Sequence, residues 1–265
     1  MISPESAYLY RDSGMTGDAV SRHVVEQAAA FLEEGAFAQM LVSWVVAPGD
    51  HWSVALRTWV AGSGCDAWLL HDDTVDPLTH AGAWLRHEAR GDSDAHAAAL
   101  DRWLAYFERL GIEMIAVGAV ILRRRNGANW VLADELSSDR LGQASDHILR
   151  VFAAQDFLTS TRDEQALLAE SLALDEHAQL EQRVAYRDGG WNADEIAVTL
   201  RDGLGFRATL DGTTGGMLAA LDGRRTLGQV AGDLARLQGV SPEEAERALL
   251  PVARQMLVTG FLVRV

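Results

Sequence analysis

The amino-acid sequence predicts a mixed α/β fold, in which a sheet flanked by helices is followed by a smaller, mainly helical module. Three observations lead to this prediction. A nearly continuous apolar run of strand length lies at residues 37–46, helical and strand-like patterns alternate around it, and two helix-capping patterns stand near the C-terminus. Hydrophobic residues make up 48% of the 265-residue chain, which is enough for one large or two small cores.

The first predicted element is a helix that begins after Asp18 and ends before Gly35. Asp18 can cap its amino end, and a glycine can adopt the left-handed conformation that closes a helix. The apolar residues recur at helical spacing: Val20, Val24, Ala28, Phe31 and Leu32. The run FAQMLVSWVV at residues 37–46 follows, and such continuous apolar sequence is typical of a central strand that is covered on both faces.

The chain then alternates between helices and strands. A second amphipathic helix at residues 52–60 precedes a short strand at residues 66–70. A helical stretch at residues 77–111 precedes a further strand at residues 112–122. Because parallel strands are joined by right-handed crossovers that place helices on the sheet, this order predicts a doubly wound sheet with the 37–46 strand in its middle.

A domain boundary is predicted near residues 134–140, so that residues 1–133 form the sheet domain and residues 134–205 a helical connector. Residues 206–265 then form a winged-helix-like module. Two capping boxes, at residues 226–229 and 241–244, indicate where its last two helices begin. The expected order is strand, three helices and strand, at residues 206–210, 213–221, 227–237, 242–258 and 261–265.

The charge balance and the cysteine count restrict the classes of function. All 23 basic residues are arginines, and 38 acidic residues give a net charge of −15, which disfavours tight nonspecific binding to phosphate backbones. No apolar run approaches the roughly 18 residues of a membrane span, and the N-terminus lacks the order of a signal peptide. With Cys65 as the single cysteine, we expect a cytoplasmic protein without membrane partners.

The N-terminal residues resemble a particular class of enzyme. Residues Ile2–Pro4, Tyr8–Gly14 and Gly17–Arg22, followed by a helix and Gly35, are similar to the segment after the Asn-Pro-Pro-Tyr/Phe motif of amino- and amide-methylating enzymes. The resemblance is to class I S-adenosylmethionine-dependent methyltransferases of the methyltransferase small domain family, related to release-factor glutamine and ribosomal-RNA guanine methyltransferases. Residues Leu221–Thr226, which enter a helix, are similar to the winged-helix extension of the same family.

This resemblance implies that residues 1–133 are the C-terminal half of a Rossmann-like methyltransferase sheet. The runs at residues 37–46, 66–70 and 112–122 would be its fifth, sixth and seventh strands, and the family fold implies that the last of them is antiparallel. The implied activity is S-adenosylmethionine-dependent N-methylation of a protein amide or a nucleic-acid base. The implied partner is therefore a protein or nucleic-acid substrate.

Two departures from the family pattern concern the mechanism. The chain contains no Asn-Pro-Pro-Tyr/Phe motif, and no strand followed by a Gly-x-Gly-x-Gly turn precedes the matching segment. The glycine-containing stretches at residues 13–17, 62–64 and 212–216 do not supply one. We therefore assign no catalytic, cofactor-binding or metal-binding residue, and we expect this chain to be an inactive fragment that does not bind S-adenosylmethionine alone.

The loop after the missing motif is the part of the site that this chain can still provide. Ser3, Tyr8, Tyr10, Arg11 and Asp12 are the candidates for lining a substrate cleft; the competing interpretation is a surface loop. The histidines and aspartates between residues 71 and 87 have no recognised metal-ligand spacing and are interpreted as solvated. The tryptophans are interpreted as core residues. The turn Arg123–Arg125 is interpreted as solvated, with contact to phosphate or to an acidic partner surface as the alternative.

Two further functions fit the sequence. One is a non-catalytic binding module, whose last helix carries Glu243, Glu244 and Glu246 against Arg247 and Arg254 and so favours a protein partner over DNA. The other is a split methyltransferase, in which a separate N-terminal half pairs with the exposed sheet edge.

Overall fold

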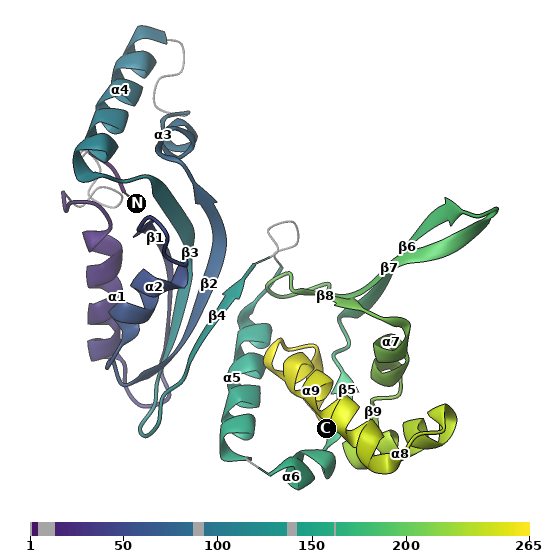
Figure 1. The fold of residues 1–265 in the computed structure, drawn as a ribbon. Coiled ribbons are helices and arrows are strands. Elements are labelled where there is room, and N and C mark those ends of the chain that lie inside the picture. Colours follow the sequence, from purple (N-terminus) through teal and green to yellow (C-terminus); the bar gives the residue numbers. More distant parts are fainter. Residues whose placement is uncertain (1, 5–13, 87–92, 137–141, 162) are drawn as a thin grey trace. The chain divides into compact units, whose positions relative to one another are not determined.

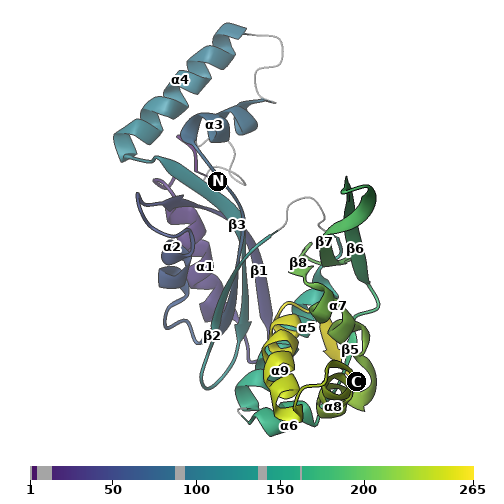
Figure 2. The same cartoon turned by 45° about the vertical axis from the view of Figure 1, so that its right-hand side comes forward.

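The computed structural model describes residues 2–4, 14–86, 93–136, 142–161 and 163–265. The chain divides into two compact units, Met1–Leu136 and Ser137–Val265. Both units contain helices and strands, so the chain has a mixed α/β fold (Figures 1 and 2). Among the described residues, the helices are too short or too polar to span a bilayer.

The first unit is built around one four-stranded sheet. Its elements are α1 (Ala19–Phe31), β1 (Phe37–Val46), α2 (Ser53–Val60), β2 (Cys65–Val75), α3 (Pro77–Leu85), α4 (Ser93–Leu110), β3 (Met114–Arg124) and β4 (Val131–Glu135). The strand order is β1-β3-β2-β4. β3 runs antiparallel to both β1 and β2, and β4 runs parallel to β2. The sheet is therefore mixed, and β1 and β2 point in the same direction on either side of β3.

The prediction that the 37–46 strand lies in the middle of the sheet is wrong, because β1 is an edge strand. It is also not covered on both faces. Val42 and Trp44 are buried on the face that α1 and α2 cover, whereas Leu41, which points to the other face, is 92% exposed. An apolar run identifies a strand, but its place in the sheet depends on pairing with β3, which is distant in sequence.

The two buried clusters of this unit occupy different places. One lies between the sheet and helices α1 and α2 and includes Trp44, Leu56 and Trp59. The other lies among α3, α4 and the start of β3 and includes Trp103, Phe107 and Ile115. The tryptophans 44, 52, 59, 68 and 103 are all buried, which confirms their interpretation as core residues; Trp84 is 39% exposed.

The second unit contains two small antiparallel sheets and five helices among its described residues. Its elements are α5 (Ser145–Ser160), α6 (Glu164–Leu168), β5 (Ser171–Leu174), β6 (Ala178–Arg187), β7 (Gly190–Leu200), β8 (Arg207–Leu210), α7 (Gly212–Ala219), β9 (Asp222–Thr226), α8 (Leu227–Gln238), α9 (Pro242–Val258) and β10 (Leu262–Arg264). The sheet orders are β10-β5-β9 and β6-β7-β8.

The helix starts of the last module follow local sequence closely. Thr226 and Gln229 form both bonds of the predicted capping box at α8, and Ser241 accepts a hydrogen bond from the backbone N–H of Glu244 at α9. Helix α9 spans the predicted residues 242–258. The prediction of a helical connector holds for α5 and α6, but it is wrong for residues 171–200, which form β5, β6 and β7.

Candidate functional site

Residues 2–4, where the predicted substrate loop begins, lie at the carboxyl end of β1. Ile2 is fully buried in the cluster formed by α3, α4 and Ile115, and Ile115 pairs with Val45 near the end of β1. The carbonyl oxygen of Ile2 lies 3.2 Å from Nε2 of His80 on α3. Ser3 is buried beside it, with 9% of its surface exposed.

The other end of this loop is fixed at the same edge of the sheet. The backbone N–H of Gly17 donates to the hydroxyl of Tyr106 at 2.8 Å, and the carboxylate of Asp18 accepts from the backbone N–H of Val45 at 3.0 Å. Ligands of open α/β sheets bind outside the carboxyl ends of the strands, which is where both loop ends lie. The other predicted substrate-binding residues, Tyr8, Tyr10, Arg11 and Asp12, lie outside the described residues.

Asp18 has a different role from the predicted helix cap. Its side chain makes no capping bond to α1 and instead bonds to β1. Ser21, one turn later, accepts from the backbone N–H of Ser43 at 3.3 Å. Because alternate residues of a strand point their N–H groups to the same edge, α1 thereby satisfies two donors on the outer edge of β1.

The sequence analysis missed a cluster of aromatic and polar side chains. Its members are Trp44 of β1, Trp52 just before α2, and His71 and Thr74 of β2. The rings of Trp52 and His71 stack with centroids 5.0 Å apart, and Trp44 lies edge-on to His71 at 6.2 Å. Nε2 of His71 is 2.7 Å from the hydroxyl of Thr74. His71 was interpreted as solvated, but it is half-buried in this cluster; nothing in its local sequence indicates that Trp52 reaches it.

Two adjacent carboxylates at the end of β4 each accept an indole N–H. Trp68 donates to Asp134 at 2.8 Å, and Trp52 donates to Glu135 at 3.1 Å. Successive residues of a strand point to opposite faces, so the two carboxylates serve opposite faces of the sheet. Burial raises the pKa of Asp134, and the hydrogen bond from Trp68 opposes this rise.

A bulge in β2 brings this region close to β3. The register of β2 against β3 shifts between His71 and Asp73. A Cβ atom at Gly118 of β3 would lie 2.0 Å from the carbonyl oxygen of Leu70, so only glycine fits there. Asp76 then caps α3 by accepting from the backbone N–H groups of Leu78 and Thr79. The hydroxyl of Thr79 also donates to Asp76 at 2.6 Å, and this bond, followed by the backbone bonds, lowers the pKa of Asp76.

The predicted arginine turn is largely held within the chain. Arg123 bonds to the fully buried Asp66 at 2.5 Å, and Arg125 lies 3.6 Å from the same carboxylate. Arg124 donates to the carbonyl oxygen of Ser63 at 2.8 Å. These bonds fix the end of β3 to the start of β2, so the interpretation as a solvated turn is wrong.

His147 in the second unit occupies an enclosed polar region. Its Nδ1 accepts from the backbone N–H of Leu204 at 3.1 Å, so its Nε2 carries the proton and donates to the carbonyl of Thr259 at 2.9 Å. A Cβ at Gly203 or Gly260 would lie 2.6 or 2.4 Å from the imidazole. Burial lowers the pKa of His147, and the bond to Thr259 opposes this, so the ring is a neutral link between three segments.

A polar cavity of about 90 Å³ adjoins His147. Arg150, which lines it, lies 3.3 Å from Asp175, and its buried Nε has no hydrogen-bond partner. His177 and Asp202 line the other side, 3.5 Å apart. Acidic side chains outnumber the single arginine in its lining, so the cavity offers no clear preference for an anion.

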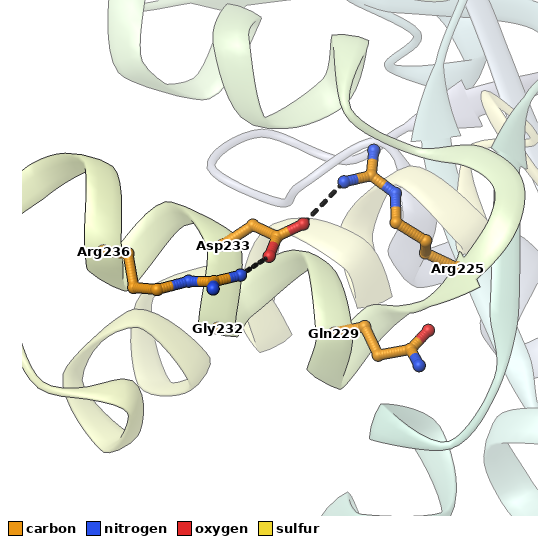
Figure 3. Close-up of a pocket in the computed structure, with 5 residues that line it drawn as sticks. All are labelled: Arg225, Gln229, Gly232, Asp233 and Arg236. Carbon is orange, nitrogen blue, oxygen red and sulfur yellow. Dashed lines mark hydrogen bonds and ion pairs between the residues drawn. The ribbon is translucent and has the colours of Figure 1, made fainter.

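An open depression of about 480 Å³ lies over α8 (Figure 3). Asp233 accepts hydrogen bonds from both Arg236 and Arg225, the latter at 2.7 Å, and these two bonds lower the pKa of Asp233. Both arginines are thus engaged by one carboxylate. Arg225 also lies 3.8 Å from Asp222, so two carboxylates balance the two arginines and the depression is not a strong anion site.

Residues 212–216 do not form the strand–turn–helix glycine fingerprint of a nucleotide-type cofactor site. The one glycine-rich stretch that follows a described strand, residues 212–216 after β8, lies inside α7, and Asp211 caps that helix by accepting from the backbone N–H of Thr214. Across the described part of the chain, no cluster of three or more His, Cys, Asp or Glu residues is arranged to hold a metal ion. His80, one of the histidines interpreted as solvated, is buried, and His87 lies outside the described residues.

One comparison with known families gives a match. Residues 149–264 match a family described as a domain of unknown function (DUF7782). The matched segment runs from α5 to β10 and so covers most of the second unit, including Arg150, His177 and Asp202.

Proposed function

We propose that the first unit is the C-terminal half of a class I S-adenosylmethionine-dependent methyltransferase, which N-methylates a protein amide or a nucleic-acid base. One observation carries this proposal: the strand order β1-β3-β2, with β3 antiparallel to both neighbours. In the class I methyltransferase sheet the seventh strand lies antiparallel between the fifth and the sixth, and the runs at residues 37–46, 66–70 and 112–122 were assigned those places.

The exposed apolar surface of the first unit supports the same proposal. Leu41 on the edge strand β1 is 92% exposed. Large apolar side chains at a sheet edge are unusual in a complete domain, because such edges are usually covered or charged. A preceding half of the sheet would cover Leu41.

The residues that this chain would contribute are the loop ends at the carboxyl edge of β1. Ser3 stays a candidate for lining the substrate cleft, because it lies at that edge beside the buried Ile2. Residues 212–216 do not fit the cofactor, so its binding and the in-line placement of the methyl group would belong to residues that precede this chain or to a second polypeptide. No catalytic step is assigned to this chain.

Asp18 and Ser21 occupy the edge of the sheet at which the two halves of a split enzyme would have to meet. Their bonds to Val45 and Ser43 occupy the outer edge of β1, where a separate half would add its strand. Strand addition there, from a separate or from a continuous polypeptide, requires α1 to release these bonds.

The genomic sequence upstream of the first codon tests the proposal. We expect an open reading frame, in frame or adjacent, that encodes a strand with a Gly-x-Gly-x-Gly turn and ends in Asn-Pro-Pro-Tyr or Asn-Pro-Pro-Phe. A closed frame with no such neighbour would contradict it. Calorimetry with S-adenosylmethionine should give no heat of binding to the 265-residue chain, whereas micromolar affinity would show that the chain holds a cofactor site of its own.

The second unit is proposed to be a winged-helix-like protein-binding module. Helices α6, α8 and α9 contact one another, and β10 pairs with β5 after α9, as in that class of module. The negative charges of Glu243, Glu244 and Glu246 on α9 repel the phosphates of DNA and so disfavour DNA binding. Fluorescence anisotropy with labelled duplex DNA at low salt should show no binding, and submicromolar affinity would overturn this assignment.

A further inference from the structure

Strands β6 and β7 form a two-stranded arm that extends from the rest of the second unit (Figure 1). Its turn consists of Asp188 and Gly189, which both have positive φ angles of 55° and 79°. This pair is the preferred sequence for a tight hairpin turn. β8 pairs only with residues 196–199 of β7, so the outer part of the arm is two strands wide.

One face of the arm carries no charged side chain. Directly opposed residues of an antiparallel pair share a face, and alternate residues of each strand return to it. This uncharged face comprises Leu180, Gln182, Val184 and Tyr186 of β6 with Trp191, Ala193, Ile196 and Val198 of β7. The rings of Tyr186 and Trp191 lie 5.5 Å apart, which confirms that they share this face.

The charged residues of the arm pair with one another on its opposite face. Arg187 bonds to Asp194 at 2.7 Å, and Glu195 lies 3.6 Å from Arg183 and 2.9 Å from Arg207 of β8. The bond from Arg207 is the largest of the effects that lower the pKa of Glu195. The two faces are therefore fully separated into an uncharged one and an ion-paired one.

The uncharged face borders an apolar cavity at its base and is exposed further out. At the base, Leu180 and Val198 line an apolar cavity of about 170 Å³ together with Leu218 of α7. Val184, Tyr186 and Trp191 lie beyond this cavity and are 48%, 64% and 73% exposed, and Leu180 itself is 67% exposed. An exposed strip that is apolar apart from Gln182 marks an interaction surface, and Trp and Tyr are the residues that most often dominate one.

The chemistry of the strip restricts its partner. An uncharged face offers no cation with which to bind the phosphates of nucleic acid or anionic lipid. A second copy of the chain brings an identical uncharged strip, and around a two-fold axis the ion-paired faces of both arms remain outside. No charge is then buried.

The exposed area is sufficient for a weak dimer. Tyr186 and Trp191 are 64% and 73% exposed, so each still offers roughly 100–180 Å² of the about 150–250 Å² that such a side chain buries in full. With Leu180 and Val184, one arm offers at most roughly 500 Å². Two arms together offer at most roughly 1,000 Å², the lower limit of a specific interface. We propose that the uncharged faces of two β6–β7 arms pack against each other and form a weak homodimer of this chain.

Sedimentation velocity of the full 265-residue chain tests this proposal. We expect the mass to rise from 28.8 kDa towards twice that value between low and high micromolar concentration. The dimer should become tighter between about 0.05 and 0.5 M salt, because screening weakens repulsion between two chains of like charge. A chain that stays monomeric throughout this range would overturn the proposal.

Matched variants locate the contact. Tyr186→Ser with Trp191→Ser should weaken dimerisation at least about tenfold without changing the net charge, whereas Leu237→Ser, at an 84%-exposed residue of α8, should leave it unchanged. An equal loss in Leu237→Ser, or no loss in the double variant, would contradict the arm contact. Arm-dependent sedimentation with phosphatidylcholine vesicles in place of dimerisation would assign the strip to a lipid surface and overturn the dimer.

Cysteine cross-linking gives a second measurement that does not depend on the stability of the arm variants. Cys65 is buried, so an introduced cysteine is the exposed thiol available for oxidation within the described residues. Val184→Cys on the uncharged face should form a disulfide-linked dimer under mild oxidation. Arg183→Cys on the opposite face should not, and equal cross-linking of both variants would overturn the face-to-face arrangement.

Discussion

The two units differ in whether the surface of an outlying strand is covered by the chain's own contacts or left exposed. β1 lies at the edge of its sheet, and Asp18 and Ser21 of α1 accept hydrogen bonds from two of its outer N–H groups. The β6–β7 arm instead carries Tyr186 and Trp191 outward on a face without charges. Such protection shields an edge strand from unintended pairing with another copy of the chain. The comparison therefore assigns self-association to the arm and not to the edge of β1.

The same contrast appears in the placement of tryptophan. Trp44 of β1 is fully buried against α2 and donates its indole N–H to the carbonyl oxygen of Trp52 at 2.8 Å. Trp191 of β7 is 73% exposed and contacts Tyr186 across the arm. Substitutions at the two kinds of position should thus have opposite consequences, for stability in one case and for association in the other.

The largest expected effect separates the stability of the two units. Gly118→Val places side-chain atoms where a Cβ already meets the carbonyl oxygen of Leu70 at 2.0 Å. We expect a loss of about 3–5 kcal/mol in the stability of the first unit, because β2 and β3 must move apart. Hydrogen exchange measured by mass spectrometry should show faster exchange in residues 37–75 and 114–135 only.

Gly82→Ala is the matched control for this prediction. A Cβ at Gly82 in α3 meets no atom within 4 Å, so alanine should leave stability unchanged or raise it by about 0.5–1 kcal/mol. Equal exchange rates in both units after Gly118→Val would mean that the units do not unfold separately.

The counterpart in the second unit is His147→Ala. It removes a buried ring and leaves the N–H of Leu204 and the carbonyl of Thr259 without their partner, so we expect a loss of about 3 kcal/mol. Exchange should accelerate around residues 145–160 and 259–264. A loss below about 1 kcal/mol would show that water replaces the imidazole at this position.

His147 also predicts the pH dependence of the second unit. Burial lowers its pKa in the folded state below the value of about 6.5 in an unfolded chain. At a pH above about 6.5 both states are neutral at this histidine, and His147 does not reduce the stability of the unit. Between about 6.5 and the lower pKa of the folded state, the unfolded chain binds a proton that the folded chain does not, so the stability decreases as the pH falls. Urea unfolding of the wild type and of His147→Asn should be monitored by hydrogen exchange at several pH values. The stability of the second unit should decrease less with falling pH in the variant than in the wild type.

A smaller effect tests the protected edge of β1. Asp18→Ala with Ser21→Ala removes both acceptors of the outer N–H groups, and we expect a loss of about 1–3 kcal/mol. The amides of Ser43 and Val45 should then exchange faster, and the variant should associate more readily than the wild type. Glu26→Ala, at an exposed residue of the same helix, is the control and should change neither property.

The smallest effect is expected in the arm. Trp191→Ser removes one cross-strand aromatic contact, so the stability of the second unit should fall by less than about 1 kcal/mol. Thermal unfolding followed by far-ultraviolet circular dichroism measures this change. A large decrease would mean that Trp191 supports the fold, and the contrast between a protected edge and an associating arm would be lost.

The strands of the arm show what sequence reasoning missed in the second unit. Residues 178–200 were included in a helical connector, and Leu180 and Val184 are indeed spaced as on a helix face. The turn Asp188-Gly189 between two runs of alternating residues was the available signal for a hairpin. The alternation was obscured because Gln182 interrupts the apolar face and the bulge between Arg183 and Val184 shifts the register.

The sequence by itself determined the elements whose cause is local. The capping box at Thr226, the start of α9 at Pro242 and the strand at residues 37–46 depend on neighbours within a few residues, and each was found where it was predicted. Only the tertiary structure decided that β4 pairs with β2, that Asp18 bonds to β1, and that His71 stacks on Trp52. These contacts join residues far apart along the chain, and strand pairing and side-chain packing between distant segments leave no periodic pattern in the sequence.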